Sequence, residues 1–339
     1  MSKGIYTGPS EDNFKSETDI LYEGIDKQEP IVLSGKNESD MTFNDWMGEL
    51  AHRRDVRMDV EGIPSEGEIE IKSNTPIVVA LMGDQHISGF YGDYELLRDH
   101  ANFIRSCPKA YVVVGGDVID GAAFNPAQDD KIASFNEETA VARKMLDWLS
   151  ESMLCACAGD HDMWAGRGGI TMYHDFKDRY KRPLFRGSST LKLKVGETDY
   201  KIVMAHRLPG HSMYNKVHGQ NRESKFGQQG ADVYVGWHNH QKGIAQQVAK
   251  QAGDEDLMQT FVSPGAYKYS DGYAQKLGFA QQSRKELGAV WLVLHPDRKE
   301  VEAYWNMESA KERIEPYLKG SRNNPVKVTA DEIIKEITK

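Results

Sequence analysis

The chain is poor in cysteine and has no long apolar run. Three of its 339 residues are cysteines, and Cys155 and Cys157 alternate within one apolar run, as on one face of a strand. This count and spacing predict neither a cysteine zinc site nor a disulfide framework. No stretch approaches the roughly 18 uninterrupted apolar residues of a membrane span, and the first residues hold no apolar signal region. We therefore expect a soluble, cytoplasmic protein without a membrane partner.

An excess of positive charge is also missing. The 42 lysines and arginines are outnumbered by 51 aspartates and glutamates, which gives a formal net charge of -9. This balance disfavours a protein that coats nucleic acid nonspecifically, because such proteins carry a basic surface. One segment departs from it, since residues 181–225 hold ten basic side chains against three acidic ones. The segment would either steer an anionic substrate or form a solvated face that offsets acidic neighbours.

Residues 1–75 are polar and predict an N-terminal arm with one amphipathic helix, from about residue 44 to 54. The apolar side of this helix consists of Phe43, Trp46, Met47 and Leu50. Such a side suits docking on the main domain or on a partner protein. At the other end, residues 311–339 predict a polar tail with a short helix that starts near Thr329.

Residues 76–310 show the pattern of an α/β catalytic domain. Apolar runs at 76–82, 110–115, 154–158, 200–205 and 231–236 predict buried strands, and residues 94–106 and 137–152 predict helices that cover a sheet. Later runs at 258–264, 289–295 and 301–306 alternate more in polarity. We expect these later runs to build a second, partly antiparallel sheet.

Each of the five buried runs stops at acidic or histidine side chains. These are Asp84 and His86, Asp117 and Asp120, the run Asp160, His161 and Asp162, then His206, and finally His238 and His240. Because the carboxyl ends of strands in an α/β domain converge on one edge, we expect these side chains to gather there.

The order of these motifs resembles the calcineurin-like metallophosphoesterase superfamily, whose signature is D-x-H, G-D-x-x-D, G-N-H-D or E, a lone His and G-H-x-H. The resemblance covers residues 76 to about 270, and it is nearest to the SbcD-like nucleases and the compact phage-type phosphoesterases. It implies a four-layer αββα sandwich of two mixed β-sheets flanked by helices.

The resemblance also implies a site for two divalent metal ions. One ion would be held by Asp84, His86 and His240, the other by Asp160, His206 and His238, and Asp117 would bridge them. Two cations so close repel each other, and a shared carboxylate with a bridging hydroxide holds them together and provides the nucleophile. Manganese is the expected metal because imidazoles are mixed with hard carboxylates, and iron or zinc would also fit.

In the same family the histidine at the place of His161 faces the leaving group and protonates or stabilises it. Asp162 would hold the imidazole of His161 and raise its pKa. Asp120 is either an acceptor for the imidazole of a metal ligand or a simple helix N-cap.

Two residues depart from the family pattern. Asp160 stands where the family has Asn, which makes the site one charge less positive and should strengthen metal binding while weakening Lewis acidity. Trp237 stands where the family has Gly in G-H-x-H, and it would either stack on a base beside the metals or pack in the core.

The segment after His206 holds candidate substrate-binding residues. Arg207, His211 and Ser212 would contact phosphate from a loop that enters a helix, although an arginine paired with an acid would equally explain Arg207. Tyr214 and His218 extend the same segment and would also line the cleft. Of the remaining histidines, His52, His100, His174 and His295 fall outside the motifs, and we expect them on the surface or in the core.

The expected function is that of a dinuclear metal-dependent phosphodiesterase or nuclease that acts on nucleic acid or a nucleotide. The first alternative is a phosphomonoesterase for a small molecule or a phosphoprotein. The second is a mainly structural or binding module, for example in a phage virion or a repair assembly, with the N-terminal arm contacting a protein partner. The fold does not choose among these functions.

Overall fold

The computed structural model describes residues 41–61, 65–121, 130–165, 173, 176–212, 214–250, 256–270, 272–276, 278 and 280–318. The chain divides into two compact units, residues 1–62 and 63–339. In the first unit, the expected helix is α2 (Phe43–Glu61). Thr42 and Asp45 exchange hydrogen bonds at its start, and Phe43, Met47 and Leu50 are exposed. Docking of α2 stays a prediction. No helix in the described part of the chain is long and apolar enough to cross a membrane.

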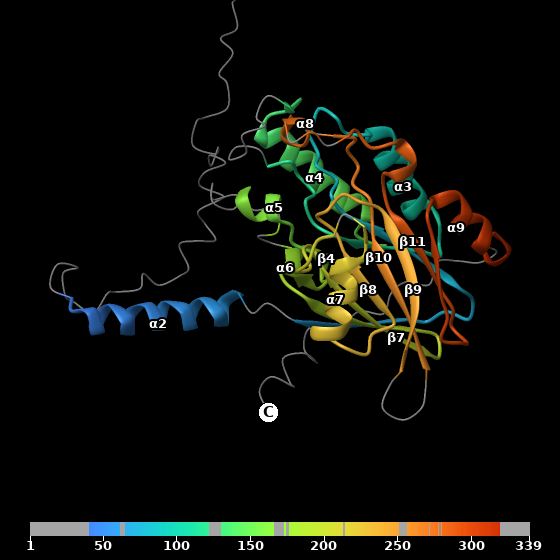
Figure 1. Ribbon diagram of the computed structural model, residues 1–339, viewed down its shortest axis with the longest axis horizontal. Coiled ribbons are helices and arrows are strands. Elements are labelled where there is room, and N and C mark those ends of the chain that lie inside the picture. The colour runs from blue at the N-terminus through green and yellow to red at the C-terminus, as the bar shows by residue number, and fades with distance from the viewer. Residues whose placement is uncertain are drawn as a thin grey trace, which may run out of the picture. The chain divides into compact units, whose positions relative to one another are not determined.

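The second unit contains two six-stranded sheets (Figure 1). The order of the first sheet is β1 (Glu66–Ile71), β6 (Ser189–Val195), β7 (Thr198–Ala205), β8 (Val233–Gly236), β10 (Asp256–Ser263) and β9 (Gly243–Lys250). The order of the second sheet is β12 (Val301–Tyr304), β11 (Val290–Leu294), β2 (Ile77–Met82), β3 (Ala110–Val114), β4 (Met153–Cys157) and β5 (Leu184–Phe185). Both sheets contain parallel and antiparallel neighbours.

Helices cover the outer faces of both sheets. The described helices of this unit are α3 (Tyr94–Ser106), α4 (Phe135–Leu149), α5 (Asp160–Ala165), α6 (Phe176–Tyr180), α7 (His218–Phe226), α8 (Gly272–Lys276), α9 (Met307–Ile314) and the 3-10 turns η6 (Arg284–Glu286) and η7 (Glu315–Tyr317). Helices α3, α4 and α9 pack their apolar sides on the second sheet, and α7 packs on β8 and β10 of the first. The expected αββα sandwich of two mixed sheets is therefore confirmed.

The alternation of side chains along a strand explains why the central strands are apolar throughout. In β2, Ile77, Val79 and Leu81 face the first sheet, whereas Val78 and Ala80 face the helices. A strand with a covered face on each side needs apolar residues at every position.

The expected organisation needs two corrections. Strand β1 pairs with β6 although it lies within the predicted polar arm, so the sheets begin before residue 75. The later runs do not build a sheet of their own, because β10 joins β8 in the first sheet and β11 extends the second beside β2. Among these runs, only β12 is an edge strand and half-exposed, whereas β10 and β11 lie inside their sheets, so alternation of polarity along the chain does not reveal the partner. The tail helix expected near Thr329 lies outside the described residues.

Candidate dinuclear metal centre

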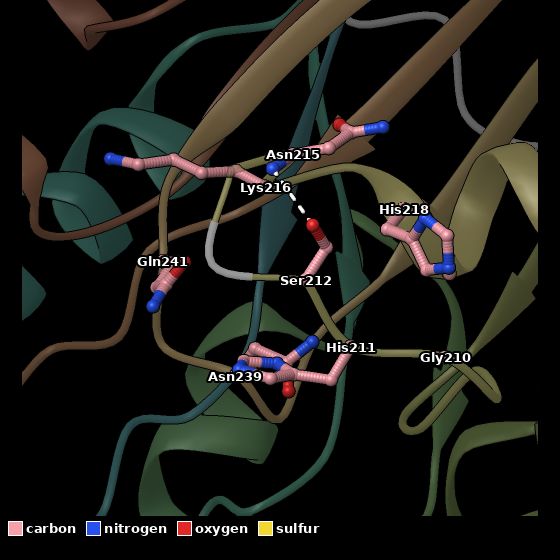
Figure 2. Close-up of a pocket in the computed structure, with 9 residues that line it drawn as sticks. Gly210, His211, Ser212, Asn215, Lys216, His218, Asn239 and Gln241 are labelled. Carbon is pink, nitrogen blue, oxygen red and sulfur yellow. Dashed lines mark hydrogen bonds between the residues drawn. The ribbon is translucent and has the colours of Figure 1, made fainter.

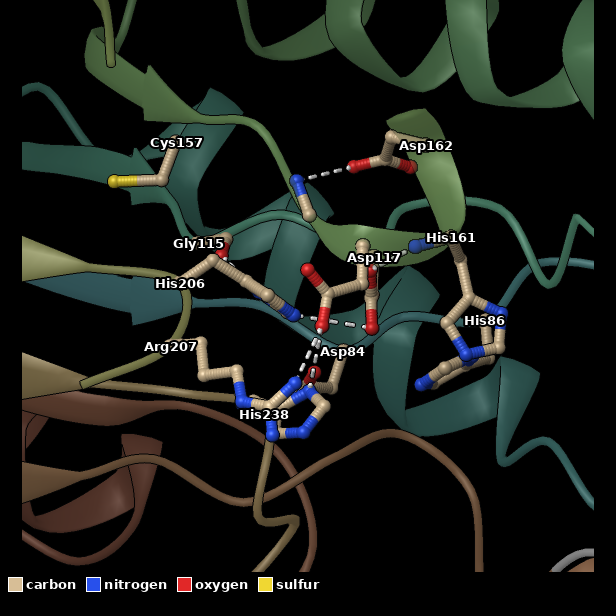
Figure 3. Close-up of polar contacts among 12 residues, drawn as sticks. Asp84, His86, Gly115, Asp117, Cys157, His161, Asp162, His206, Arg207 and His238 are labelled. Atoms are coloured by element: carbon tan, nitrogen blue, oxygen red, sulfur yellow. Dashed lines mark hydrogen bonds and ion pairs between the residues drawn. The ribbon is translucent and has the colours of Figure 1, made fainter. Parts of the chain in front are cut away.

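Strands of both sheets end at the same place and bring the predicted ligands together. Strand β2 is followed by Asp84 and His86, β3 by Asp117, β4 by Asp160, β7 by His206, and β8 by His238 and His240. Figure 3 shows residues from all five strand ends pointing toward one centre. The centre therefore lies at the carboxyl ends of strands from both layers.

The backbone of the predicted ligands is unusual. Seven of the described residues other than glycine have a positive φ, and five of them are predicted ligands. Their φ angles are 51° for Asp84, 45° for His86, 49° for Asp117, 71° for His238 and 55° for His240. For a residue with a Cβ atom, this left-handed conformation is less stable than the right-handed one by roughly 1–2 kcal/mol. Such strain collects at functional sites, where the fold must aim side chains that a regular strand would not.

A first cluster consists of Asp84, His86 and His240, whose ligand atoms all lie within 4.8 Å of one another. The Nε2 atoms of His86 and His240 are 3.0 Å apart, and His240 Nε2 is 3.7 Å from Asp84 Oδ1. Asp84 is completely buried, and its Oδ1 has no hydrogen-bond partner among the described residues. An unpaired buried carboxylate oxygen facing two imidazole nitrogens fits a cation.

His86 is oriented as a neutral ligand. Its Nδ1 donates to Asp120 Oδ1 at 3.1 Å, which leaves Nε2 without a proton and directed at the cluster. Burial, together with the nearby Lys268 ammonium, holds the pKa of His86 well below its ordinary value. Lys268 is itself buried and lies 3.3 Å from the same Asp120 oxygen. Asp120 thus has the predicted role of acceptor for a ligand imidazole.

A second cluster consists of Asp117, His206 and His238, again with ligand atoms within 4.8 Å of one another. His206 Nδ1 donates to the carbonyl of Gly115 at 2.8 Å, so that Nε2 faces Asp117 Oδ2 at 3.1 Å (Figure 3). Burial disfavours charge on His206, but the Asp117 carboxylate raises its pKa to about 10. The imidazolium therefore serves as counterion to Asp117 in the place that a divalent cation would take.

Asp160 lies beside the second cluster without being part of it. Its Oδ2 is 3.5 Å from His238 Nδ1 and 3.6 Å from the guanidinium of Arg207. The Asp160 side chain is 34% exposed and that of Arg207 is 67% exposed. Of the two roles expected for Arg207, the structure therefore contains the ion pair with an acid, which is Asp160.

The acidic groups of the centre need a cation. Burial, with a further contribution from Asp117, raises the pKa of Asp84 to about 7. Two buried carboxylates facing one another are stable together only if positive charge compensates them. The donor set of carboxylates and correctly oriented imidazoles therefore fits two divalent metal ions.

His161 lies at the centre, but Asp162 does not hold its ring as expected. His161 Nδ1 donates to the carbonyl of Asp120 at 2.5 Å. The buried Asp162 carboxylate instead accepts from the amides of Val118 and Gly159 at 2.9 and 3.0 Å and from the Tyr173 hydroxyl at 2.9 Å. Neighbours on a helix point about 100° apart, so His161 and Asp162 of α5 face different partners. Asp162 fixes the loops of the site.

His211 and Ser212 line a polar hollow before α7 (Figure 2). The other lining residues are Gly210, Asn215, Lys216, His218, Gly219, Asn239 and Gln241. Asn239 stands between the two histidines of the β8 loop, so the hollow adjoins the ligand segment. Ser212 Oγ accepts from the amides of Tyr214 and Asn215 and thereby stabilises its own loop. Substrate binding by His211 and Ser212 stays a prediction.

Trp237 packs in the core between the sheets and is not a platform for a base. It is 1% exposed, and its ring lies against the backbone of Gly83 and Gly115. A Cβ at position 115 would lie 2.1 Å from the indole, which explains why glycine is needed there. The tryptophan that does lie at the surface of the site is Trp164, which the sequence analysis did not single out.

The remaining histidines lie where expected, as far as they are described. His52 is exposed, His100 is buried against the Tyr267 hydroxyl, and His295 is buried against Glu302. His295 also forms a group with Glu300 and Glu302, but Arg298 and Arg313 already neutralise these acids. His174 lies outside the described residues.

No family model matches the chain, and no curated protein matches its sequence. Solved structures to which it is similar include a metallophosphoesterase from Sphaerobacter thermophilus, with 11% identity and a TM-score of 0.34 over 71% of this chain and 94% of that one. The calcineurin-like phosphoesterase YfkN from Bacillus subtilis has 10% identity and a TM-score of 0.34 over 73% and 100%. Vacuolar Protein Sorting 29 from Cryptosporidium parvum has 19% identity and a TM-score of 0.32 over 68% and 97%. At such low similarity, the activity of this chain has to be argued from its own residues.

Proposed function

We propose that the chain is a calcineurin-like, two-metal phosphoester hydrolase whose preferred substrates are phosphodiesters of nucleic acid or nucleotides. The observation that carries this proposal is the convergence of two ligand clusters from five strand ends, with five of the seven candidate ligands in the left-handed backbone region. A fold that only needed stable packing would not keep such strain around the buried carboxylates of Asp84 and Asp117, one oxygen of which, Asp84 Oδ1, has no hydrogen-bond partner among the described residues.

In this proposal Asp84, His86 and His240 would hold one ion, and His206, His238 and Asp160 would hold the other, while Asp117 would be shared by both. When bound, two divalent ions supply an activated water and neutralise charge on the phosphoryl oxygens. Manganese suits the mixture of imidazoles and carboxylates, as iron or zinc would.

His161 is assigned the protonation of the leaving group. Because a carbonyl can only accept, His161 Nδ1 must carry the hydrogen bound to Asp120. The opposite atom, Nε2, is then the one that gives a proton to the leaving oxygen. The backbone carbonyl keeps the ring in this orientation in both charge states of the imidazole.

Arg207 is assigned to bind a nonbridging phosphate oxygen. Its guanidinium is exposed and lies beside the second cluster, at a long 3.6 Å from Asp160. An exposed pair of this kind contributes little stability, so a phosphate can replace the carboxylate as the partner of Arg207.

The charge of the centre supports diesters over monoesters. Three carboxylates surround the proposed ions where the family pattern has two, so the centre has less net positive charge. A singly charged phosphodiester is favoured over a doubly charged phosphomonoester at such a site. The basic segment contributes less than its composition indicates, because Lys192 and Lys194 of β6 pair with Glu66 and Glu70 of β1.

The test is manganese-dependent hydrolysis of bis-p-nitrophenyl phosphate beside p-nitrophenyl phosphate. We expect the wild type to hydrolyse the diester, and Asp117→Asn to lower turnover about 100-fold or more with reduced metal content. Thermal unfolding of Asp117→Asn checks that the variant is folded. The matched control is Asp297→Asn, whose side chain is 71% exposed and distant in sequence from the motifs, and which should leave turnover unchanged.

Other outcomes would change the assignment. Hydrolysis of the monoester alone would indicate a phosphomonoesterase. No hydrolysis of either ester by protein shown to contain two metal ions would contradict the enzymatic proposal and favour a structural or binding role.

A further inference from the structure

Trp164 stands directly beside the proposed proton donor. It follows His161 by three residues on α5, and residues at this spacing share one side of a helix. The centroid of its indole ring is 4.6 Å from that of the His161 imidazole, and the two planes are inclined by 37°. The two rings are therefore in contact, face against tilted face.

The contact continues a row of rings that starts at the metal cluster. The His161 ring is also 4.8 Å from the ring of His86, at an interplanar angle of 88°. The rings therefore contact one another in the order His86, His161 and Trp164, which is the order of proposed metal ligand, proton donor and indole. A leaving group whose oxygen is protonated by His161 would therefore lie within reach of the Trp164 ring.

Helix α5 holds Trp164 beside His161 but leaves the indole ring partly uncovered. Helix α5 is anchored by the buried Asp162 carboxylate, which accepts from the amides of Val118 and Gly159 at 2.9 and 3.0 Å. Trp164 is nevertheless 37% exposed and Met163 is 39% exposed, whereas Trp237 and Trp291 are fully buried. A held aromatic ring with a free area beside a reactive group is suited to receiving a ligand.

The chemistry of this surface selects the ligand. A flat, uncharged indole binds flat aromatic groups, and every nucleobase has a π-face for stacking. We infer that Trp164 stacks the base of the leaving nucleoside, so that the substrate is a nucleic acid or dinucleotide rather than an alkyl phosphodiester. This inference rests on the proposed phosphodiesterase function, and Trp164 is a specificity residue within it.

The test compares three substrates. These are the dinucleotide dT-dT and two analogues, each of which lacks the base of one of its two nucleosides. For the wild type we expect kcat/KM for the analogue without the leaving base to be roughly 10-fold or more below that for dT-dT. Trp164→Ala should raise KM for dT-dT and so lower its kcat/KM to the value for the analogue without the leaving base. The kcat/KM for that analogue itself should not change. Trp164→Phe should retain most of the discrimination.

A matched control uses another exposed tryptophan. Trp148 of α4 is 51% exposed and lies against Arg105, and Trp148→Ala should change none of the three rates. If Trp164→Ala lowered kcat for all three substrates by one factor, Trp164 would only support the His161 ring and the inference would be overturned.

Equilibrium binding separates this inference from the proposed activity. The same three ligands are titrated against metal-loaded wild type and Trp164→Ala. If no diester is hydrolysed but wild type binds dT-dT more tightly than one analogue, and Trp164→Ala loses this preference, the stacking site stands and the phosphodiesterase proposal fails. Equal binding of all three by the wild type would overturn the stacking site.

Discussion

At the scale of single residues, Asp120 connects the parts of the centre. Its carboxylate accepts from the ligand His86 and lies 3.3 Å from the Lys268 ammonium, while its carbonyl accepts from His161. The side chain thus orients a metal ligand, and the backbone orients the proposed proton donor. A substitution of the side chain should separate these two roles.

We predict that Asp120→Asn weakens metal binding about 10- to 100-fold, because an amide is a poorer acceptor for the His86 Nδ1 proton. Turnover at saturating manganese should stay close to that of the wild type, since the carbonyl that holds His161 is retained. The measurement is turnover as a function of metal concentration, with metal content determined in parallel. A loss of turnover in fully metal-loaded protein would contradict the separation of roles.

Asp160 gives a second prediction at this scale. Asp160→Asn removes the charge that pairs with Arg207 and lies near His238, so half-maximal activity should need more metal. Turnover at saturating metal should be retained or increased, because the centre becomes more positive. Metal titrations of Asp160→Asn, Arg207→Gln and the double variant measure the coupling. Complete inactivity of Asp160→Asn at saturating metal would refute the expectation.

The sequence predicted the positions of the ligands better than the roles of their neighbours. Asp84, His206 and His240 could be predicted because each follows an apolar run, and runs of this kind end at one edge of the fold. The roles of Asp162 and Trp237 depend on where α5 begins and on which glycines leave room for a ring. Neither property can be read from motif spacing.

At the scale of elements, the strands were predictable and several of their partners were not. The runs that became β2, β3, β4, β7 and β8 are apolar because both faces of each strand are covered. The same apolarity does not tell which sheet a strand joins, so the later runs were wrongly assigned to one sheet although β10 and β11 belong to different ones. The polar strand β1 was missed as well, because its Glu66, Glu68 and Glu70 resemble an arm.

Strand β1 allows a prediction about the boundary of the catalytic unit. A chain that begins at residue 63 should keep the stability of the two sheets, whereas one that begins at residue 76 loses β1. The buried Ile69 and Ile71 go with it, at a cost of about 3–6 kcal/mol at 1.5–3 kcal/mol per side chain. Urea unfolding of both chains and the full-length chain gives the comparison. Equal stability of the two shortened chains would place β1 outside the cooperative unit.

At the scale of the whole molecule, the centre makes metal-free stability depend on pH. Burial raises the pKa of Asp84 to about 7, and Asp117 raises that of His206 to about 10 against the effect of burial. Both folded-state pKa values lie above the ordinary 3.8 and 6.5, so these two groups bind more protons in the folded protein than in the unfolded chain. The stability that these groups contribute is therefore lost as pH rises. Burial lowers the pKa of Lys242 to about 8 and also lowers the pKa values of His86, His100 and His238, and these groups have the opposite, smaller effect over the same range.

We predict that metal-free protein loses about 1 kcal/mol of stability between pH 6.5 and pH 8, a few degrees in Tm. Manganese should raise Tm more at pH 8 than at pH 6.5, because metal binding requires the unprotonated Asp84 and a free His206 Nε2. Calorimetry with chelator and with saturating manganese measures both effects. Asp84→Asn serves as the control, since it removes a titrating group and a ligand and should reduce both. If the metal-free Tm stayed constant over this range, these buried groups would not titrate as predicted. If manganese raised Tm less at pH 8 than at pH 6.5, metal binding would not compete with protonation of Asp84 and His206.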